Sequence, residues 1–398
     1  MLLPSELVMI NYFRMLFNEI SKPSLNDFLG SAGVLWVKRV SVLSAIIVSP
    51  ILLADDYDTS CDAVGNVEPI CGFQRPEDLA VMLGEKLLLV SEYGSLDGSK
   101  SGYLSSYRIH DGAIERLYPT NSMTRIDSGN TWGAKNCPGP PGKEFSPHGL
   151  YHNALVAPDR LAVINHGGRE SIELFEVTLS DGGLDAALTW RGCVLAPQGA
   201  WFNDVVRLPN GNFIASHMMD RGLAHDQLLG LESSKDATGY VLQWSRKTGW
   251  QKVSNSEGAL PNGLEVSSDG KILFVNYYFG DKVIALELEG GRRLWEVDVL
   301  GPDNSSWGLD GTLLIASHQE DLAAVLHCSE SGESFCPLKY AIIALNPASG
   351  EKTTLLTGGG APFGGTTVAV QASNELFLGS FAGNRMAKRF IRSQEIAQ

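Results

Sequence analysis

Short polar elements recur six times along the chain, each just before an apolar run and separated by roughly 40 to 70 residues. The residues at the equivalent position are Glu77, His148, Asn203, Asn262, Asn304 and Gly365. Equivalent positions in a pseudo-symmetric repeat lie on one ring around its axis. We therefore expect the acidic and amide members, together with Asp303, to converge on one point with His148 beside them.

The side chains of this ring favour a hard metal ion. Carboxylate and amide oxygens without thiols are the ligands of Ca²⁺, which takes six to eight oxygens, whereas Mg²⁺ keeps more water. Glu77 and Asp303 supply two negative charges, and the asparagines add oxygens without adding repulsion. The alternative is that Asn-Gly and Asn-Asp only form turns, as in any all-β chain. Their repetition in one register favours the calcium site.

A second set of polar and aromatic residues closes the following apolar runs. Its members are Glu92, His166, His217, Tyr277, His318 and Phe381. A histidine at a strand end is often structural, but His148 and His166 belong to the same repeat. One imidazole can take a proton from water while the other orients it. We expect His217, Tyr277 and His318 to line the substrate space.

The elements that must position these residues are paired strands. Strand-turn-strand phrases begin at Leu79, Leu155, Val205, Leu264, Trp307 and Val368. Within the body of the chain, helical periodicity is confined to a stretch near residues 222–232, so a parallel α/β sheet with crossover helices is excluded. Six units with room for four strands each predict an all-β fold, a six-bladed β-propeller.

The first residues differ from this body. Residues 40–54 form an uncharged apolar run after Lys38 and Arg39, shorter than the roughly 20 residues of a membrane span. The pattern predicts a signal peptide, with an uncleaved N-terminal anchor as the alternative. We therefore divide the chain into a leader, 1–54, and a single hydrolase domain, 55–398, and expect export to the periplasm or beyond.

Charge and cysteines support this assignment. The 398 residues carry a net charge of −14, which disfavours nucleic acid and anionic lipid, so membrane contact is expected only through the leader. None of the six cysteines forms a C-x-x-C pair, and an exported chain favours disulfides. Neighbouring positions suggest Cys328–Cys336 and Cys61–Cys71, while Cys137 and Cys193 each stand alone. The oligomeric state stays open.

Seven ordered motifs extend from Pro76 to the C-terminal strands. They are PEDL at 76–79, FSPHGL at 145–150, VINHGGRESIELFEV at 163–177, FNDVV at 202–206, PNGLEVSSDGK at 261–271, PDN at 302–304 and the closing GGTTVAV and LFLGSF. Together they resemble the paraoxonase (arylesterase) family. The wider gluconolactonase-like group of calcium-dependent propellers shares the Glu/Asn/Asn pattern but not the His-Gly and Asn-His pair.

The resemblance implies two calcium ions in a central tunnel and hydrolysis of lactones and aryl esters. The catalytic ion would be held by Glu77, Asn203, Asn262, Asp303 and Asn304. The structural ion would be held by Asp78, Asp204 and the backbone carbonyl of Leu150. His148 and His166 match the proposed catalytic dyad of the family.

Calcium would polarise the ester carbonyl while His148 accepts a proton from water, with a carboxylate of the ring as the alternative base. The chain has no G-x-S-x-G elbow, so a serine-hydrolase route has no support.

The chain departs from the family in three places. No cysteine follows Cys336, so ring closure must rest on strand pairing. Residues 319–339 form an insertion, and residues 218–235 fall where the family has a lid. Leucines 223, 228, 229 and 231 there either cover an apolar substrate or pack a surface helix. A gluconolactonase-like sugar lactonase and a non-catalytic, calcium-stabilised binding scaffold stay as alternative functions.

Overall fold

The computed structural model describes residues 61–95, 97–119, 132–180 and 182–390. Within this part of the chain, which lies in one unit spanning residues 55–398, strands assemble into six sheets. The predicted leader, 1–54, lies outside the described residues. No helix of the described part is both long and apolar enough to cross a membrane.

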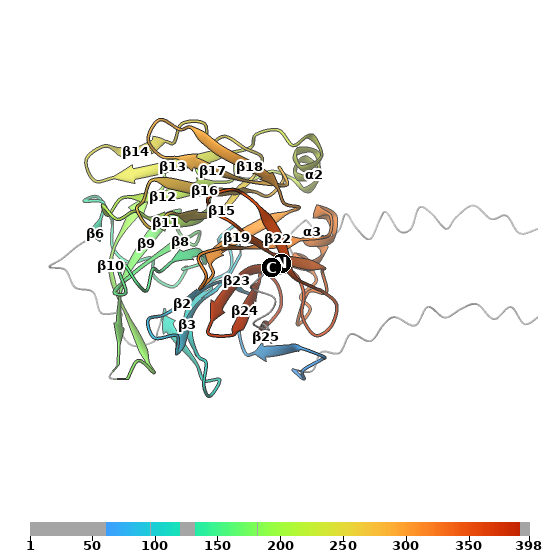
Figure 1. The fold of residues 1–398 in the computed structure, drawn as a ribbon. Coiled ribbons are helices and arrows are strands. Elements are labelled where there is room, and N and C mark those ends of the chain that lie inside the picture. The colour runs from blue at the N-terminus through green and yellow to red at the C-terminus, as the bar shows by residue number, and fades with distance from the viewer. Residues whose placement is uncertain (1–60, 96, 120–131, 181, 391–398) are drawn as a thin grey trace, which may run out of the picture. The chain divides into compact units, whose positions relative to one another are not determined.

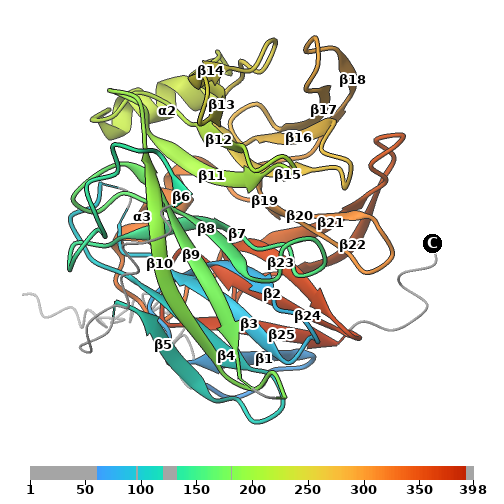
Figure 2. The same cartoon turned by 90° about the vertical axis from the view of Figure 1, so that its left-hand side faces the viewer.

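Each sheet is a blade whose first strand is innermost, and Figure 2 shows these first strands near the middle with the fourth strands toward the rim. The first three blades are β2(Pro76–Val81), β3(Leu87–Glu92), β4(Tyr103–Arg108) and β5(Ile114–Tyr118); β7(Pro147–Tyr151), β8(Arg160–Asn165), β9(Ser171–Leu179), β10(Ala186–Leu195) and β6(Trp132–Gly133); and β11(Phe202–Arg207), β12(Phe213–His217), β13(Tyr240–Ser245) and β14(Gly249–Lys252).

The other three blades complete the ring seen in Figure 1. They are β15(Pro261–Val266), β16(Ile272–Tyr277), β17(Lys282–Glu287) and β18(Arg293–Asp298); β19(Pro302–Trp307), β20(Leu313–His318), β21(Tyr340–Leu345) and β22(Lys352–Gly358); and β23(Thr366–Ala372), β24(Glu375–Ser380), β25(Arg385–Phe390) and β1(Val67–Cys71). The predicted six-bladed propeller is thus confirmed.

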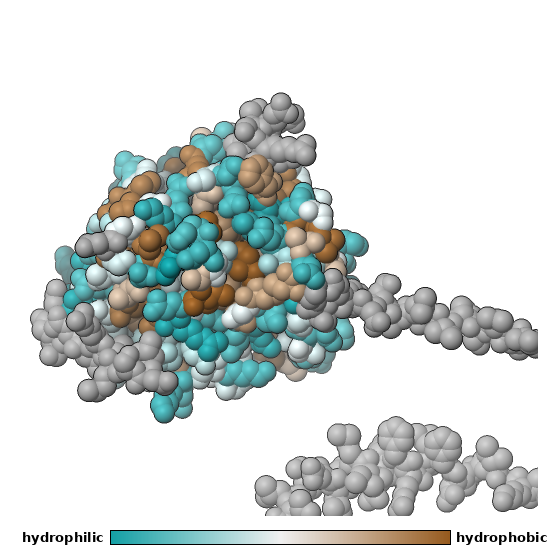
Figure 3. All heavy atoms as spheres, turned by 90° about the horizontal axis from the view of Figure 1, so that it is seen from below, coloured by the Kyte–Doolittle hydropathy of each residue, from teal (hydrophilic) through white to brown (hydrophobic). Residues whose placement is uncertain are grey.

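Ring closure rests on strand pairing, as expected. The first described strand, β1, pairs antiparallel with the last, β25, in a register that runs from Val67 opposite Arg389 to Cys71 opposite Arg385. Alternating apolar residues fill the spaces between blades, for example Val90 and Phe377 in one cluster and Ile214 and Val275 in another. Hydrophilic residues cover much of the face shown in Figure 3, around hydrophobic residues toward its middle.

In five blades the polar elements that the sequence places before the first strands are in fact part of those strands, whereas in the sixth blade β23 begins at Thr366, directly after Gly365. Every first strand shifts register against its second strand within its first few residues. The predicted spacing of the repeats is therefore correct, but the first strands begin a few residues earlier than predicted. At the second blade the difference is largest: Leu155 and Val156, predicted as strand, lie in an exposed loop between β7 and β8.

Two further features were not predicted. The stretch near 222–232 is helical as expected, forming α2(His225–Ser234), but the insertion at 319–339 contains a second helix, α3(Leu322–Glu330). The disulfides Cys61–Cys71 and Cys328–Cys336 confirm the two predicted pairings. Cys137 and Cys193 do not stand alone, because they form a third disulfide.

Candidate active site

β-Bulges place the ring residues at the centre of the propeller. The register shifts leave unpaired Glu77 in β2, His148 in β7, Asn203 in β11, Asn262 in β15, and Asp303 and Asn304 in β19. A bulge re-aims the side chains of its extra residues, and each first strand contacts the next around the axis. All six side chains are buried, and Glu77 lies within 2.8 Å of Asn304 and 3.7 Å of His148, so these members of the ring come together.

Glycines let these strands come close. An added Cβ at Gly149 would lie 2.6 Å from the Asn203 carbonyl oxygen, and one at Gly263 would lie 2.5 Å from the Asp303 carbonyl oxygen. Any side chain at either position would push two first strands apart. The Gly of FSPHGL and the Gly of PNGLEV therefore keep the ring narrow.

Four buried oxygen atoms of the ring have no hydrogen-bond partner among the described residues. They are Glu77 Oε2, Asn203 Oδ1, Asn262 Oδ1 and Asn304 Oδ1. Leaving one buried acceptor unsatisfied costs about 1–3 kcal/mol, so four at one centre need an explanation. A cation bound by oxygen supplies it, since these atoms are the donor set that calcium prefers.

The electrostatics of the ring fit a bound cation. Burial, then Asp78 and Asp303, raise the pKa of Glu77 well above its usual range, and burial raises the pKa of Asp303 to about 8. In the described part of the chain only histidines lie within ion-pair distance of these two carboxylates: His148 Nε2 is 3.7 Å from Glu77 Oε1, and His318 Nε2 is 3.7 Å from Asp303 Oδ2. A divalent cation would restore their ionisation.

The amide oxygens carry this fit. Among the described residues no group of three or more His, Cys, Asp or Glu side chains is arranged to hold a metal ion. The ring offers enough oxygen ligands for a calcium ion only when the side-chain carbonyls of the asparagines are included. Asn304 Nδ2 donates to Glu77 Oε1 at 2.8 Å, which turns the Asn304 oxygen away from that carboxylate.

The two aspartates of the predicted structural ion have a different environment. Asp78 Oδ2 accepts from the Leu150 N–H at 2.7 Å, and Asp204 Oδ2 accepts from the Leu264 N–H at 2.7 Å, so each links two blades. Burial raises the pKa of Asp78 to about 7 and that of Asp204 well above its usual range. Because their oxygens already have partners, unsatisfied acceptors do not argue for an ion here. The Leu150 contact observed is through its amide.

The two histidines of the predicted dyad are in direct contact. His148 Nδ1 lies 2.9 Å from His166 Nε2, both rings are buried, and Tyr93 packs on His148 with ring centroids 5.0 Å apart. His166 directly follows β8. Burial, then His166, lower the pKa of His148, and burial, then Arg221, lower that of His166 to about 3. Both imidazoles are therefore neutral near pH 7.

Hydrogen bonds define which nitrogen of each ring carries the proton. His166 Nδ1 lies 3.0 Å from Glu170 Oε2, and a carboxylate only accepts, so this Nδ1 carries the hydrogen. His166 Nε2 then accepts from His148 Nδ1–H. The remaining nitrogen, His148 Nε2, holds a free lone pair and is the one that faces Glu77. It is in position to act as a base beside the oxygen ring.

The hydrogen bonds that lead from His148 through His166 form a relay, and Glu170 and Arg221 extend it. Neither of these two residues was predicted from the sequence. Arg221 forms an ion pair with Glu170 and lies over the Trp201 ring, and Glu170 Oε1 also accepts from the Phe202 N–H at 2.7 Å. Glu170 lies within HGGRES, four residues after His166, where the carboxylate could have been noticed. Arg221 has no local signal because it comes from the segment after β12.

The three residues expected to line the substrate space differ in placement. His318 Nδ1 lies 2.7 Å from the Tyr278 hydroxyl, and His318 Nε2 faces the ring. His217 Nδ1 accepts from the Trp201 N–H at 3.0 Å. Tyr277 packs instead in the apolar cluster between blades, against Gly258, so its neighbour Tyr278 takes the place expected for it.

Both insertions cover the region beside this centre. Helices α2 and α3 contact each other, and Leu223, Leu228 and Leu231 pack against a cluster that contains Trp201, Met218, Phe279 and Leu322. Met218 Sδ lies 3.4 Å from Asn203 Nδ2, and Arg221 reaches Glu170. Leu223, Leu228 and Leu231 thus pack as a surface helix on a neighbouring blade, as one of the two alternatives expects, whereas Leu229 is exposed.

The fold is a six-bladed propeller with buried polar side chains at its axis. Residues 133–386 match the Arylesterase family, and the chain belongs to that family. Family membership supports a hydrolase of the lactonase and esterase class that acts on small molecules. Three disulfides are typical of an exported protein.

Three solved structures align with this chain at low sequence identity. A luciferin-regenerating enzyme aligns with a TM-score of 0.51 at 14% identity, over 82% of this chain and 95% of that chain, which shows the fold alone. A gluconolactonase from Xanthomonas campestris aligns at 0.47 with 17% identity, over 81% and 89%. Virginiamycin B lyase from Staphylococcus aureus aligns at 0.45 with 11% identity, over 82% and 99%. No curated protein matches the sequence significantly.

Proposed function

We propose that the protein is a calcium-dependent hydrolase of lactones and aryl or other carboxylic esters. One observation carries the proposal: four blades each contribute a buried oxygen without a hydrogen-bond partner among the described residues, and the free nitrogen of His148 lies 3.7 Å from the carboxylate of one of them, Glu77. The oxygens fit a calcium ion, and the histidine fits a base that activates water. A non-catalytic binding scaffold does not require a relay of neutral histidines behind the base.

Glu77, Asn203, Asn262, Asp303 and Asn304 would hold the catalytic ion. When bound, calcium supplies a positive charge that polarises the ester carbonyl and stabilises the oxyanion of the transition state. Asp78, Asp204 and the Leu150 carbonyl stay our proposed ligands for a second, structural ion, on the family resemblance alone.

The residues of the relay divide the proton-transfer task. His148 Nε2 takes the proton of the attacking water and returns it to the leaving oxygen. His166 Nε2 accepts the hydrogen of His148 Nδ1, which holds the ring in the required tautomer. Glu170 orients His166, and Arg221 holds Glu170. Water is excluded from behind the dyad because both rings are buried.

The cover over the site favours apolar substrates. Met218 and Phe279, packed with Leu228 and Leu231 of α2, present hydrocarbon rather than hydrogen-bonding groups. A sugar lactone would require polar partners for its hydroxyls, whereas an aryl ester or an alkyl-substituted lactone would bury apolar surface. We therefore rank aryl esters and medium-chain lactones above gluconolactone. Export to the periplasm or the medium completes the proposal.

Hydrolysis of phenyl acetate and of a medium-chain lactone by the full chain tests this function. We expect turnover of both, loss of turnover on chelation, and recovery with Ca²⁺ but not with Mg²⁺. Turnover that survives complete removal of calcium would refute the calcium dependence. Absence of turnover on every ester and lactone, by a chain that holds calcium, would favour the scaffold function.

A further inference from the structure

A cavity lies at the opposite ends of the strands that carry the active-site residues. In β11 the ring residue Asn203 is near the start and Arg207 is the last residue, roughly 13 Å away at about 3.3 Å per residue. The cavity has a volume of about 290 Å³ and lies between the second and third blades. We name it the arginine pocket and define it by Trp132, Arg160, Arg207, Phe213, Trp244 and Arg246.

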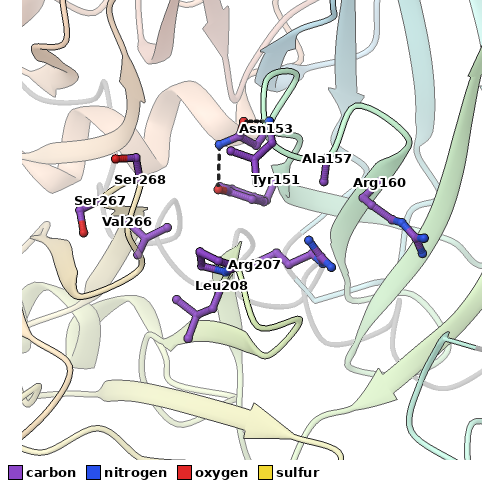
Figure 4. Close-up of a pocket in the computed structure, with 11 residues that line it drawn as sticks. Tyr151, Asn153, Ala157, Arg160, Arg207, Leu208, Val266, Ser267 and Ser268 are labelled. Carbon is purple, nitrogen blue, oxygen red and sulfur yellow. Dashed lines mark hydrogen bonds between the residues drawn. The ribbon is translucent and has the colours of Figure 1, made fainter.

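Three arginines gather here on a chain whose net charge is −14. Figure 4 shows Arg160 and Arg207 near each other at a smaller adjoining pocket that also contains Tyr151. No hydrogen bond or ion pair reaches the Arg207 side chain within the described ranges, and burial, then Arg160, lower its pKa. A half-buried guanidinium without a carboxylate, next to a second guanidinium, is suited to an anion.

Aromatic rings form the walls of the pocket. Arg160 stacks on Trp132 at 3.6 Å from the ring centroid, and Phe213 and Trp244 pack with centroids 6.0 Å apart. Leu174 adds hydrocarbon between them. A planar apolar group fits between such surfaces, because aromatic rings favour stacked and edge contacts.

The wall that carries Trp132 is built into the fold. Strand β6 is a fifth strand added parallel to β10, with Trp132 opposite Gly192 and Gly133 opposite Cys193. A Cβ at Gly192 would lie 2.2 Å from the Trp132 carbonyl oxygen, so only glycine allows this approach. The Cys137–Cys193 disulfide ties the chain after β6 to the same strand. The Trp132 backbone is thus fixed by pairing, by close approach and by a covalent link.

We propose that the arginine pocket is a binding site for a small aromatic carboxylate, with the carboxylate on Arg207 and the ring between Trp132 and the Phe213–Trp244 pair. Arg160 lies over Trp132 and adds positive charge that its ion pair with Asp159, at 3.2 Å, partly offsets. The pocket is separate from the oxygen ring and does not depend on the proposed hydrolase function.

Calorimetric titration of the full, calcium-loaded chain with benzoate and 2-naphthoate tests the site. We expect saturable binding of both, and weaker binding by on the order of tenfold or more in Arg207→Gln, since a charged bidentate bond is lost. Arg207→Lys should recover only part of the affinity. Benzamide and inorganic phosphate should bind much more weakly than 2-naphthoate, because each lacks one of the two recognised features.

Two controls separate this site from the active site. Arg292→Gln removes an exposed arginine of another blade and should bind like the wild type. His148→Gln should also bind like the wild type, whereas loss of binding there would place the ligand in the active site and overturn the proposal. So would unchanged affinity in Arg207→Gln, no saturable binding by the wild-type chain, or phosphate binding as tight as that of 2-naphthoate.

Discussion

The two ends of the first strands are chemically opposite. Counting only partners in the described segments, Asn203 at the start of β11 leaves a buried oxygen unsatisfied among carboxylates, and Arg207 at its end leaves a guanidinium unpaired among aromatics. The same change occurs along the second blade, from His148 and His166 at one end to Arg160 at the other. One end is suited to a cation and the other to an anion.

This contrast shows how one blade can serve two sites. Side chains a few residues apart on a strand are far enough for their charges to be separately screened or compensated. In the first strands the register shifts lie at the ring end, where side chains must converge, while the other end of each first strand keeps regular pairing, as between Arg207 and Phe213. Perturbing one end should therefore leave the other intact.

Loss of the ring carboxylate should have the largest effect. We expect Glu77→Gln to lose the catalytic calcium, to abolish hydrolysis and to lower the melting temperature. A ligand present at a thousand times its Kd stabilises the fold by about 4 kcal/mol, and that stabilisation disappears with the site. Elemental analysis, hydrolysis and thermal unfolding measure the three effects. The fraction of the variant that stays folded should still bind benzoate at the arginine pocket. If the variant retained its calcium, Glu77 would be excluded as a ligand.

His148→Gln should remove the base without removing the ion. General-base groups contribute on the order of 10²- to 10⁴-fold to rate, so we expect turnover to fall within that range while calcium content and melting temperature stay near those of the wild type. Initial rates on two lactones and one aryl ester, beside calcium content, provide the comparison. Unchanged rates on all three would assign the base to a ring carboxylate.

Glu170→Gln should act through the tautomer of His166. An amide can donate to His166 Nδ1 and favour the wrong hydrogen arrangement, so we expect a fall in kcat on the order of 10- to 100-fold. Arg221→Gln should lower kcat less, because the Phe202 amide still holds Glu170. Glu170→Asp serves as the conservative variant. The pH profile of kcat should change in Glu170→Gln; an unchanged profile with lost stability would give Glu170 a purely structural role.

The double variant Cys137→Ser/Cys193→Ser should affect hydrolysis least. The bridge lies beside Trp132 and on the outer strand β10, where Cys193 is opposite Glu173 of β9, so it does not contact the dyad. We therefore expect weaker 2-naphthoate binding with kcat near that of the wild type. Calorimetry and phenyl acetate hydrolysis on the same preparation measure both. A matched loss of both would show that the two ends are coupled.

The propeller and the ring are the parts that sequence periodicity reveals. Because the strand-turn-strand pattern occurs six times, an error in one copy does not change the predicted fold. Six copies identify the propeller even though Leu155 lies in a loop. The ring residues followed because each stands at the same point of its repeat. Features without a repeat were missed: β6 and the Cys137–Cys193 bridge join segments that no spacing connects, and Arg221 reaches Glu170 across the blades.

Tyr277 illustrates a smaller limit. Adjacent residues of a strand point to opposite sides, so an error of one position at a strand end exchanges a buried side chain for a site-facing one. Tyr278 contacts His318, whereas Tyr277 packs between blades. The spacing of the repeats assigns a residue to a blade, but it does not decide whether its side chain faces the site or the space between blades.

The central claim is that the unsatisfied oxygens of the ring hold calcium. Calcium content of the purified, dialysed full chain, measured for the wild type, Asn262→Ala and the exposed turn variant Asn346→Ala, tests it most directly. We predict bound calcium in the wild type, at least one ion fewer per chain in Asn262→Ala, and no change in Asn346→Ala. A wild-type chain that is folded and holds no calcium in calcium-containing buffer would contradict the account.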